Sequence, residues 1–260
     1  MDRLLRLTAV PAFADNYIWL LANASGDAVV VDPGDAGPVR AALARDQLRL
    51  RAILLTHHHA DHIGGAAELA AEAGATVYAP VDARIASADV RVGDGERVEL
   101  DAPRLRFEVI AIPGHTLSHI AYFGHGLLFC GDTLFSVGCG RLFEGSPAQM
   151  LASLDRLAAL PGDTLICCGH EYTQANCAFA RTVEPNNEAL AARSAQVETL
   201  RAQGAATLPV ALDVERACNP FLRIDSAALI TAFDRHSHAD RVGRFAELRR
   251  LKDHFRMPAP

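Results

Sequence analysis

The chain has 260 residues, a formal net charge of −6 and a hydrophobic content of 50%, a composition that allows a substantial core to be buried. The acidic balance, without a basic block, argues against nucleic acid as a partner. Asp2, Arg3 and Arg6 interrupt any apolar leader, and no apolar run of about 18 residues follows, so we expect a cytoplasmic protein with no membrane partner.

Apolar segments rich in Val, Ile, Leu and Phe predict strands in the first two thirds of the chain; in order, they are 17–23, 28–34, 50–57, 75–80, 106–115, 120–132 and 163–170. Alanine and leucine recur near the helical period between some of them, at 37–48, 62–74 and 146–160. The strand pattern then fades, and helices are predicted at 186–204, 226–237 and 240–253, with 208–223 as a connector. We therefore expect an α/β domain over residues 1–172 and a smaller, mainly helical domain over 173–260.

Four of the predicted strands each lead directly into a side chain that can bind a metal ion. They deliver His57, His115, Asp132 and His170. In α/β sheets functional groups gather beyond strand ends, where a rigid element aims a loop residue into a shared crevice. The repetition predicts one metal site assembled from four distant segments.

The first of these residues begins the tract His57 to His62, which reads HHHADH. In extended chain, alternate residues point to the same side, so His57 and His59 are paired and His58 points away and is not assigned as a ligand. The spacing differs from that of metalloprotease helices, whose two histidines stand four apart. His62 lies near the start of a predicted helix and is expected to approach the site from another direction.

The candidate ligands are too many for one ion and suit two. Catalytic zinc usually takes three protein ligands and water, and two ions about 3.5 to 4 Å apart can share a carboxylate. We assign His57, His59 and His115 to a first ion, Asp61, His62 and His170 to a second, and Asp132 to both. Two divalent ions with two carboxylates keep a net positive charge, which suits anionic intermediates. Zinc, iron and manganese all accept these ligands, and zinc is our first choice.

Other residues have less specific patterns. Asp32 follows an apolar strand and precedes Pro33; it either orients a ligand histidine or accepts hydrogen bonds within its own turn. The remaining histidines lack partners at ligand spacing and are expected to have ordinary polar roles: His119, His125, His236, His238 and His254. The six cysteines form no CxxC pair, and most are interpreted as reduced thiols.

The ligand pattern resembles that of the metallo-β-lactamase superfamily, with HxHxDH at His57 to His62 and later ligands in PGHT, CGDT and CGHEY. From PAFADNYIWLL to the tail LRRLKDHFRMP the whole chain is similar to the glyoxalase II family, the hydroxyacylglutathione hydrolases. The resemblance implies an αββα sandwich followed by a smaller helical domain. It also implies hydrolysis of S-D-lactoylglutathione and related S-acylglutathiones to D-lactate and glutathione, the second step of methylglyoxal detoxification. Asp61 would help to orient the attacking hydroxide.

Residue by residue, the resemblance also implies glutathione contacts, at Arg141, Phe143, Tyr172, Arg249 and Lys252. Residues three apart on a helix are neighbours, so Arg249 and Lys252 share a face and could together bind the glycine carboxylate of glutathione. The alternative is that they form a solvated basic last turn, which complements the helix dipole. Eukaryotic members typically carry Lys and Tyr at positions 141 and 143, so one phenolic hydrogen bond is in doubt here. We expect a monomer that acts on a small molecule.

Two other functions remain open from the sequence. A mononuclear iron persulfide dioxygenase of the same superfamily would use His57, His115 and Asp132 as a two-histidine, one-carboxylate face and would consume oxygen. The helical tail argues against it. A non-catalytic protein on an inherited fold would have damaged ligands, whereas all seven are present. A serine or cysteine nucleophile is disfavoured because no GxSxG motif occurs.

Overall fold

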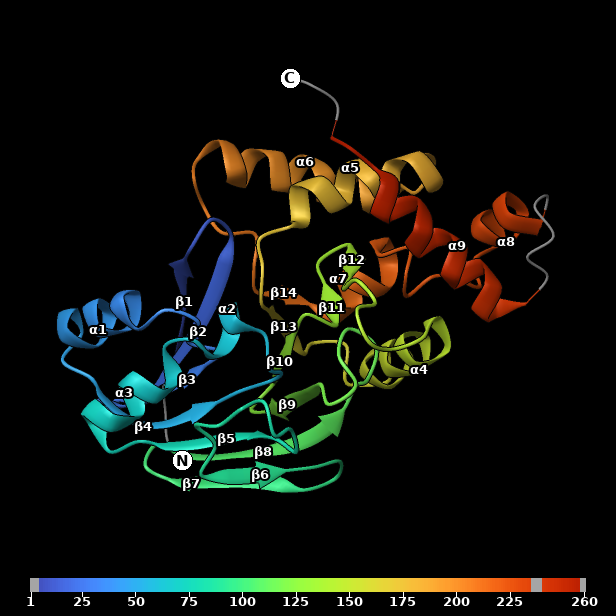
Figure 1. Ribbon diagram of the computed structural model, residues 1–260. Coiled ribbons are helices and arrows are strands. Elements are labelled where there is room, and N and C mark those ends of the chain that lie inside the picture. Colours follow the sequence, from blue (N-terminus) through green and yellow to red (C-terminus); the bar gives the residue numbers. More distant parts are fainter. Residues whose placement is uncertain (1–4, 235–239, 258–260) are drawn as a thin grey trace. The chain divides into compact units, whose positions relative to one another are not determined.

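The computed structural model describes residues 5–234 and 240–257 (Figure 1). His236 and His238, for which ordinary polar roles were expected, lie outside these residues. The chain divides into two compact units, unit 1 with residues 1–111 and 118–131, and unit 2 with residues 112–117 and 132–260. Within the described ranges, no helix has both the length and the apolar character of a membrane span.

A six-stranded sheet of unit 1 follows chain order, with strands β1 (Arg6–Ala12), β2 (Asn16–Ala22), β3 (Asp27–Val31), β4 (Arg49–Leu54), β5 (Thr76–Pro80) and β6 (Val90–Val92). The first three strands pair antiparallel and the last four parallel. Every residue of β2 and β3 is buried. This explains why their sequences read as continuous apolar runs rather than as alternating patterns.

Three helices of unit 1 connect the parallel strands: α1 (Ala36–Arg45), α2 (Ala60–Ile63) and α3 (Ala66–Ala73). Asp35 caps α1 by accepting a hydrogen bond from Gly37 N at 2.8 Å, and Gly74 ends α3 in the left-handed conformation with φ 64°. Helices α1 and α3 pack against each other and against the sheet (Figure 1). Their apolar faces and the sheet share one core, which includes Val39, Leu69 and Val77.

Unit 1 also contains four strands that pair antiparallel in chain order, β7 (Arg97–Asp101), β8 (Arg104–Ala111), β9 (Ile120–Gly124) and β10 (Leu127–Gly131). Tyr122 of β9 is fully buried, and its hydroxyl donates to the carbonyl oxygens of Leu55 at 3.0 Å and Tyr78 at 3.4 Å. This phenol therefore ties β9 to the ends of β4 and β5. A buried hydroxyl needs such partners, because an unsatisfied one destabilises the fold.

Unit 2 carries two short antiparallel pairs, β11 (Leu134–Phe135) with β12 (Gly138–Cys139) and β13 (Leu165–Cys168) with β14 (Val210–Ala211). Its helices are α4 (Pro147–Ala158), α5 (Thr173–Val183), α6 (Glu188–Ala202), α7 (Leu212–Cys218), α8 (Ala227–Asp234) and α9 (Arg241–His254). Ser146 and Gln149 form a capping box at the start of α4. Helices α5, α6 and α7 share a small core that includes Leu190 and Val197.

Most predicted elements are confirmed, and one prediction was wrong. Residues 208–223 were expected to be a connector, but β14 and α7 lie there. Pro209 and Pro220 flank a helix of only seven residues, which is too short to show a clear helical period. The elements that were not singled out from the sequence are strands β1, β6, β7, β11 and β12 and helix α5. The domain boundary after residue 172 stays a prediction.

Candidate metal centre and substrate pocket

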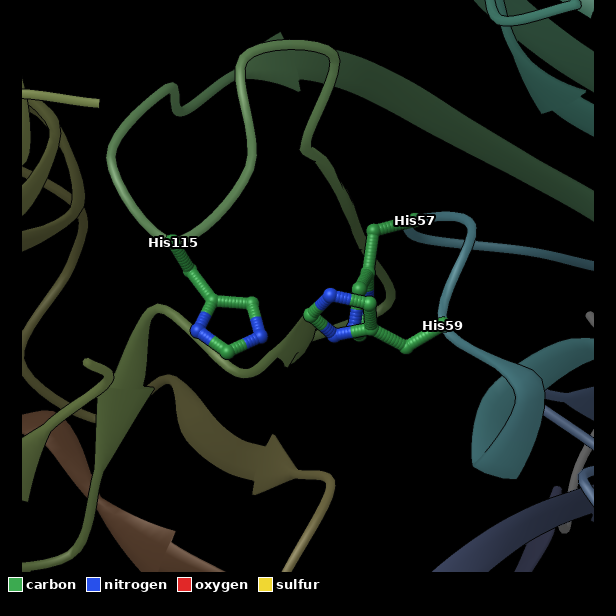
Figure 2. Close-up of side chains that lie close together, drawn as sticks. All are labelled: His57, His59 and His115. Atoms are coloured by element: carbon green, nitrogen blue, oxygen red, sulfur yellow. The ribbon is translucent and has the colours of Figure 1, made fainter. Parts of the chain in front are cut away.

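The loop after β4 brings three histidines of unit 1 together. Nε2 of His57 lies 3.1 Å from Nδ1 of His59, and Figure 2 shows these two rings edge to face, with centroids 4.8 Å apart. The ring of His62, from α2, lies 4.2 Å from that of His57. The tract therefore folds as expected, with two histidines from the loop and one from a helix.

Asp32 directly follows β3 and contacts this histidine cluster. Its backbone has a left-handed conformation, with φ 52°. Its carboxylate accepts hydrogen bonds from the backbone N–H and the hydroxyl of Thr56, at 2.8 and 2.6 Å, and it lies 3.1 Å from Nδ1 of His62. Potential ligand atoms of Asp32, His57 and His62 all lie within 4.8 Å of one another. A carboxylate that accepts the Nδ1 proton leaves Nε2 of the imidazole available for a metal ion.

Asp61 and His58, the other two polar residues of the tract, have different carboxylate or amide neighbours. Asn16 donates its amide N–H to Asp61 Oδ2 at 2.9 Å, and the same oxygen lies 3.4 Å from Nε2 of His62. The ring of His58 is turned to Asp82, with Nδ1 3.6 Å from the carboxylate. Asp61 therefore belongs to the cluster, whereas His58 contacts the ring of His59 at 4.8 Å and has the carboxylate of Asp82 as its polar neighbour.

Unit 2 contributes the other candidate ligands, centred on Asp132. Oδ2 of Asp132 lies 3.5 Å from Nε2 of His115 and 3.3 Å from Nε2 of His170. His115, which Figure 2 also draws, has its Nδ1 2.9 Å from the carbonyl oxygen of Arg141. The Nδ1 proton is donated there, so that the lone pair of Nε2 faces the carboxylate side. One carboxylate oxygen thus lies between histidines that the sequence analysis assigned to different ions.

Two aromatic rings contact these histidines. Tyr172 stacks on His170, with ring planes 5° apart and centroids at 4.7 Å. Phe143 contacts His115 edge to face at 5.2 Å, and its side chain is 63% exposed. Both residues were expected to contact the substrate, and both are placed beside a candidate ligand.

A cavity of about 380 Å³ opens within unit 2, and its lining includes every substrate-contact residue expected from the sequence. The volume falls in the usual range for small-molecule sites. The lining residues are His115, Asp132, Phe135, Cys139, Arg141, Phe143, Tyr172, Ala175, Arg249, Lys252 and Phe255. The same cavity is therefore lined by candidate metal ligands and by three cationic side chains.

Arg249 and Lys252 lie on one face of α9, as their spacing predicts, but they have different environments. Arg249 is buried and donates to the Cys139 carbonyl oxygen at 2.6 Å and to Asp253 at 2.9 Å. Its Nε has no hydrogen-bond partner among the described residues, so one buried donor remains for a ligand. Lys252 donates to the carbonyl oxygen of Ala175 at 3.3 Å. Burial lowers the pKa of Lys252 to about 8, and the charge of Arg249 contributes to this shift.

Two roles in unit 2 were not predicted from the sequence, that of Cys139 in the cavity lining and that of Asp253 as an ion-pair partner of two cavity arginines. Cys139 was interpreted as a reduced thiol, and it is one, since all six cysteines are buried and free; it also lines the cavity. Asp253, one helical turn after Arg249, lies 3.6 Å from Arg141 and 2.9 Å from Arg249. Its place four residues after an arginine on a predicted helix was the available signal.

The remaining histidines differ in their surroundings. His119 is buried and stacks on His57 at 4.5 Å. His125 accepts a hydrogen bond from the backbone N–H of Arg106, and His254 contacts the carbonyl oxygen of Arg250. His119 is thus part of the histidine cluster, whereas an ordinary polar role was expected from the sequence.

Comparisons with known proteins cover nearly the whole chain. Residues 13–170 match the family model of the metallo-beta-lactamase superfamily, and residues 171–255 match the model described as the hydroxyacylglutathione hydrolase C-terminus. A protein of Dechloromonas aromatica (strain RCB), named hydroxyacylglutathione hydrolase, is 53% identical over 94% of this chain and 91% of its own length. A protein of the same name from Xanthomonas campestris pv. campestris (strain B100) is 53% identical over 97% of this chain and 100% of its own.

Solved structures show the same fold. The crystal structure of TTHA1623 in a di-iron-bound form has a TM-score of 0.59 and 25% identity, and the match covers 83% of this chain and 100% of that chain. That structure is of a di-iron-bound form. The fold is therefore one that accommodates a pair of metal ions.

Proposed function

Because the chain belongs to the hydroxyacylglutathione hydrolase family of the metallo-β-lactamase superfamily, we propose that it hydrolyses S-D-lactoylglutathione and related S-acylglutathiones. The products would be D-lactate and glutathione, in the second step of methylglyoxal detoxification. The observation that carries this proposal is the cavity of unit 2, which His115 and Asp132 line together with Arg249 and Lys252. A thioester with a carboxylate at a distance from its reacting carbonyl matches such a lining. We further propose a cytoplasmic monomer.

The family fold implies a dinuclear metal site built from histidine and aspartate groups. The donor set fits, because imidazole and carboxylate are the groups that zinc, iron and manganese accept. His57, His59 and His115 would hold one ion, Asp61, His62 and His170 the other, and Asp132 would bridge them. The two imidazole nitrogens within 3.5 Å of one Asp132 oxygen support the bridging role. Zinc is the proposed metal.

The chemistry of hydrolysis then divides between the ions and the chain. When bound, two such ions lower the pKa of a bound water from 15.7 to about 7 and polarise the thioester carbonyl. Asp61, which Asn16 holds through a 2.9 Å hydrogen bond, orients the attacking water. The leaving thiolate has a pKa near 8.5 in its free form, so no strong general acid is needed. Asp32 keeps His62 in the tautomer that presents Nε2.

The cationic end of the cavity is proposed to bind the glycine carboxylate of glutathione. Lys252 supplies a charged ammonium below its pKa of about 8, and Arg249 supplies a buried Nε donor. Arg141 is exposed and pairs with Asp253, which places a third cation at the same cavity. Phe143 has no hydroxyl to donate, so its contribution is apolar contact.

The alternative of a mononuclear iron persulfide dioxygenase is less supported. The relatives at 53% identity carry the name hydroxyacylglutathione hydrolase over nearly the full chain. From the sequence, the helical tail was the argument against the dioxygenase. That tail, residues 171–255, matches the C-terminal model of the hydrolase family.

Hydrolysis of S-D-lactoylglutathione should show a pH dependence that arises from Lys252. Its pKa is lowered to about 8, so the ammonium that holds the substrate carboxylate is present below this pH and is lost above it. We expect KM to rise by about tenfold between pH 7.5 and 9.5, the effect of losing roughly one charge-assisted hydrogen bond. The measurement is free thiol released per unit time, corrected for spontaneous hydrolysis.

The control for this experiment is Lys252→Arg, whose guanidinium stays charged throughout the range. Its KM should change by less than about twofold over the same pH interval. A wild-type KM that is flat with pH, or an equal rise in the arginine variant, would remove Lys252 from substrate binding. Absence of thiol release at every pH, with two metal ions bound, would overturn the proposed function itself.

A further inference from the structure

We propose that Glu215 is a positioning residue for the active site. It lies on α7, in the segment that the sequence analysis interpreted as a connector. It holds the β11–β12 hairpin, which begins two residues after Asp132 and ends two residues before Arg141. The buried carboxylate of Glu215 would thereby fix the position of a candidate metal ligand, Asp132, and of the cavity wall near Arg141. The inference rests on the proposed function only in taking Asp132 as a metal ligand.

The carboxylate of Glu215 is fully buried, with 0% exposure, and points at the tip of the hairpin. It accepts hydrogen bonds from the Ser136 hydroxyl and the backbone N–H of Val137, both at 2.7 Å. Asn219 donates a third at 3.0 Å. A buried carboxylate without partners is strongly destabilising. The three donors compensate for burial, and two of them belong to the hairpin.

The hairpin tip has a backbone conformation that needs such a support. Val137 has φ 56°, a left-handed conformation that a β-branched residue rarely adopts. Strained backbone persists only where the surroundings over-determine it, and it gathers at functional sites. The N–H of this strained residue is the group that Glu215 holds. Removal of that bond should let the tip relax to an ordinary conformation.

Other polar groups from the helices of unit 2 hold the hairpin in the same place. Asn219 Nδ2 lies 3.1 and 3.0 Å from the carbonyl oxygens of Phe135 and Gly138, and Asn176 donates to the carbonyl oxygen of Ser136 at 3.0 Å. A Cβ atom at Gly138 would lie 2.5 Å from Asn176. The hairpin therefore contacts these helices closely, and its backbone carbonyls are satisfied by their amide side chains.

The two ends of the hairpin lead directly into the site. Gly140 N donates to the carbonyl oxygen of Thr133 at 3.1 Å, and a Cβ atom at Gly140 would lie 1.8 Å from the carbonyl oxygen of Asp132. Cys139, the last hairpin residue, accepts the hydrogen bond from Arg249. A displaced tip would therefore move Asp132 and the cavity wall together. Site geometry must hold within about 0.5 Å for full activity.

The first test is Glu215→Gln, which keeps the side-chain volume but replaces one acceptor oxygen by a donor. We expect affinity for Zn²⁺, measured by competition with a chromogenic chelator, to fall by about tenfold, within the range for groups that orient metal ligands. The kcat on S-D-lactoylglutathione should fall by a similar factor. Both are measured at a temperature where circular dichroism shows the variant folded.

The matched control is Glu184→Gln. Glu184 is also a buried carboxylate of unit 2, but it pairs with Arg223 and Ser226. This variant should lower Tm while its Zn²⁺ affinity and kcat stay within about threefold of wild type, the variation allowed for a change remote from the site. Equal losses in both variants, or none in Glu215→Gln, would overturn the proposal.

A second variant separates positioning from general stability. Glycine adopts positive φ without strain, so Val137→Gly combined with Glu215→Gln should recover Zn²⁺ affinity and kcat relative to Glu215→Gln alone. Its Tm should fall further, because the buried Val137 side chain is lost. Activity that follows Tm downward would show a structural role only. Failure of wild type to bind two Zn²⁺ or to turn over thioester would instead count against the proposed function.

Discussion

Replacement of Asp132 by alanine should release both metal ions and lower kcat by about 10³-fold or more, at least as much as the loss of one preorganised charge-stabilising group. The physical reason is that a single Asp132 oxygen lies within 3.5 Å of imidazole nitrogens assigned to both ions. Without it, two positive ions would face each other unscreened. Metal content after dialysis, measured by elemental analysis, and steady-state hydrolysis of S-D-lactoylglutathione provide the readout.

The control is His58→Ala, in the middle of the histidine tract. His58 is turned to Asp82 and is not assigned to either ion. It should keep both metal ions, with kcat within about threefold of wild type, as expected for a change that removes no ligand. An Asp132→Ala enzyme with two ions and near-normal kcat would contradict the dinuclear assignment, and so would loss of both ions from His58→Ala.

The second large effect is expected from Lys252→Ala, which should raise KM for S-D-lactoylglutathione by about 30-fold through loss of a charged hydrogen bond worth about 2 kcal/mol. The reason is that Lys252 lines the cavity and is partly withdrawn from water, between the rings of Phe179 and Phe255 at 5.5 Å. Because the contact is remote from the reacting carbonyl, kcat should change by less than about threefold.

Arg250→Ala is the matched control for this variant. Arg250 is on the same helix and carries the same charge, but it is exposed and pairs with Glu247 at 2.6 Å. Its removal should leave KM within about twofold of wild type, because exposed ion pairs contribute little. If both substitutions raised KM equally, the rise would be explained by the loss of positive charge in general, and the specific contact of Lys252 with the substrate would be contradicted.

The candidate metal ligands could be picked out from the sequence because several of them directly follow predicted strands. The period of two in an extended chain pairs His57 with His59, whose ring nitrogens lie 3.1 Å apart, whereas Nδ1 of His58 lies 3.6 Å from the carboxylate of Asp82. The spacing of three on α9 likewise predicted that Arg249 and Lys252 would share a face, and both line the cavity. Local periodicity was sufficient in these cases because one element fixes the direction of each side chain.

Contacts between distant segments were not accessible in this way. Asp32 had two open interpretations from the sequence, and only the fold shows that its carboxylate meets both Thr56 and His62. Glu215 lay in an expected connector, yet it contacts Ser136, 79 residues earlier. No local pattern encodes which buried carboxylate meets which backbone N–H, because the partner is chosen by tertiary packing.

The central claim is that this chain hydrolyses thioesters of glutathione in particular. Its most direct test is kcat/KM of the wild-type enzyme for S-D-lactoylglutathione compared with the D-lactoyl thioester of N-acetylcysteamine, which has the same acyl group and no glycine carboxylate. We expect a preference for the glutathione thioester of about 10²-fold or more, from the charged contacts at Arg249 and Lys252. Equal efficiency on both thioesters would contradict the claim.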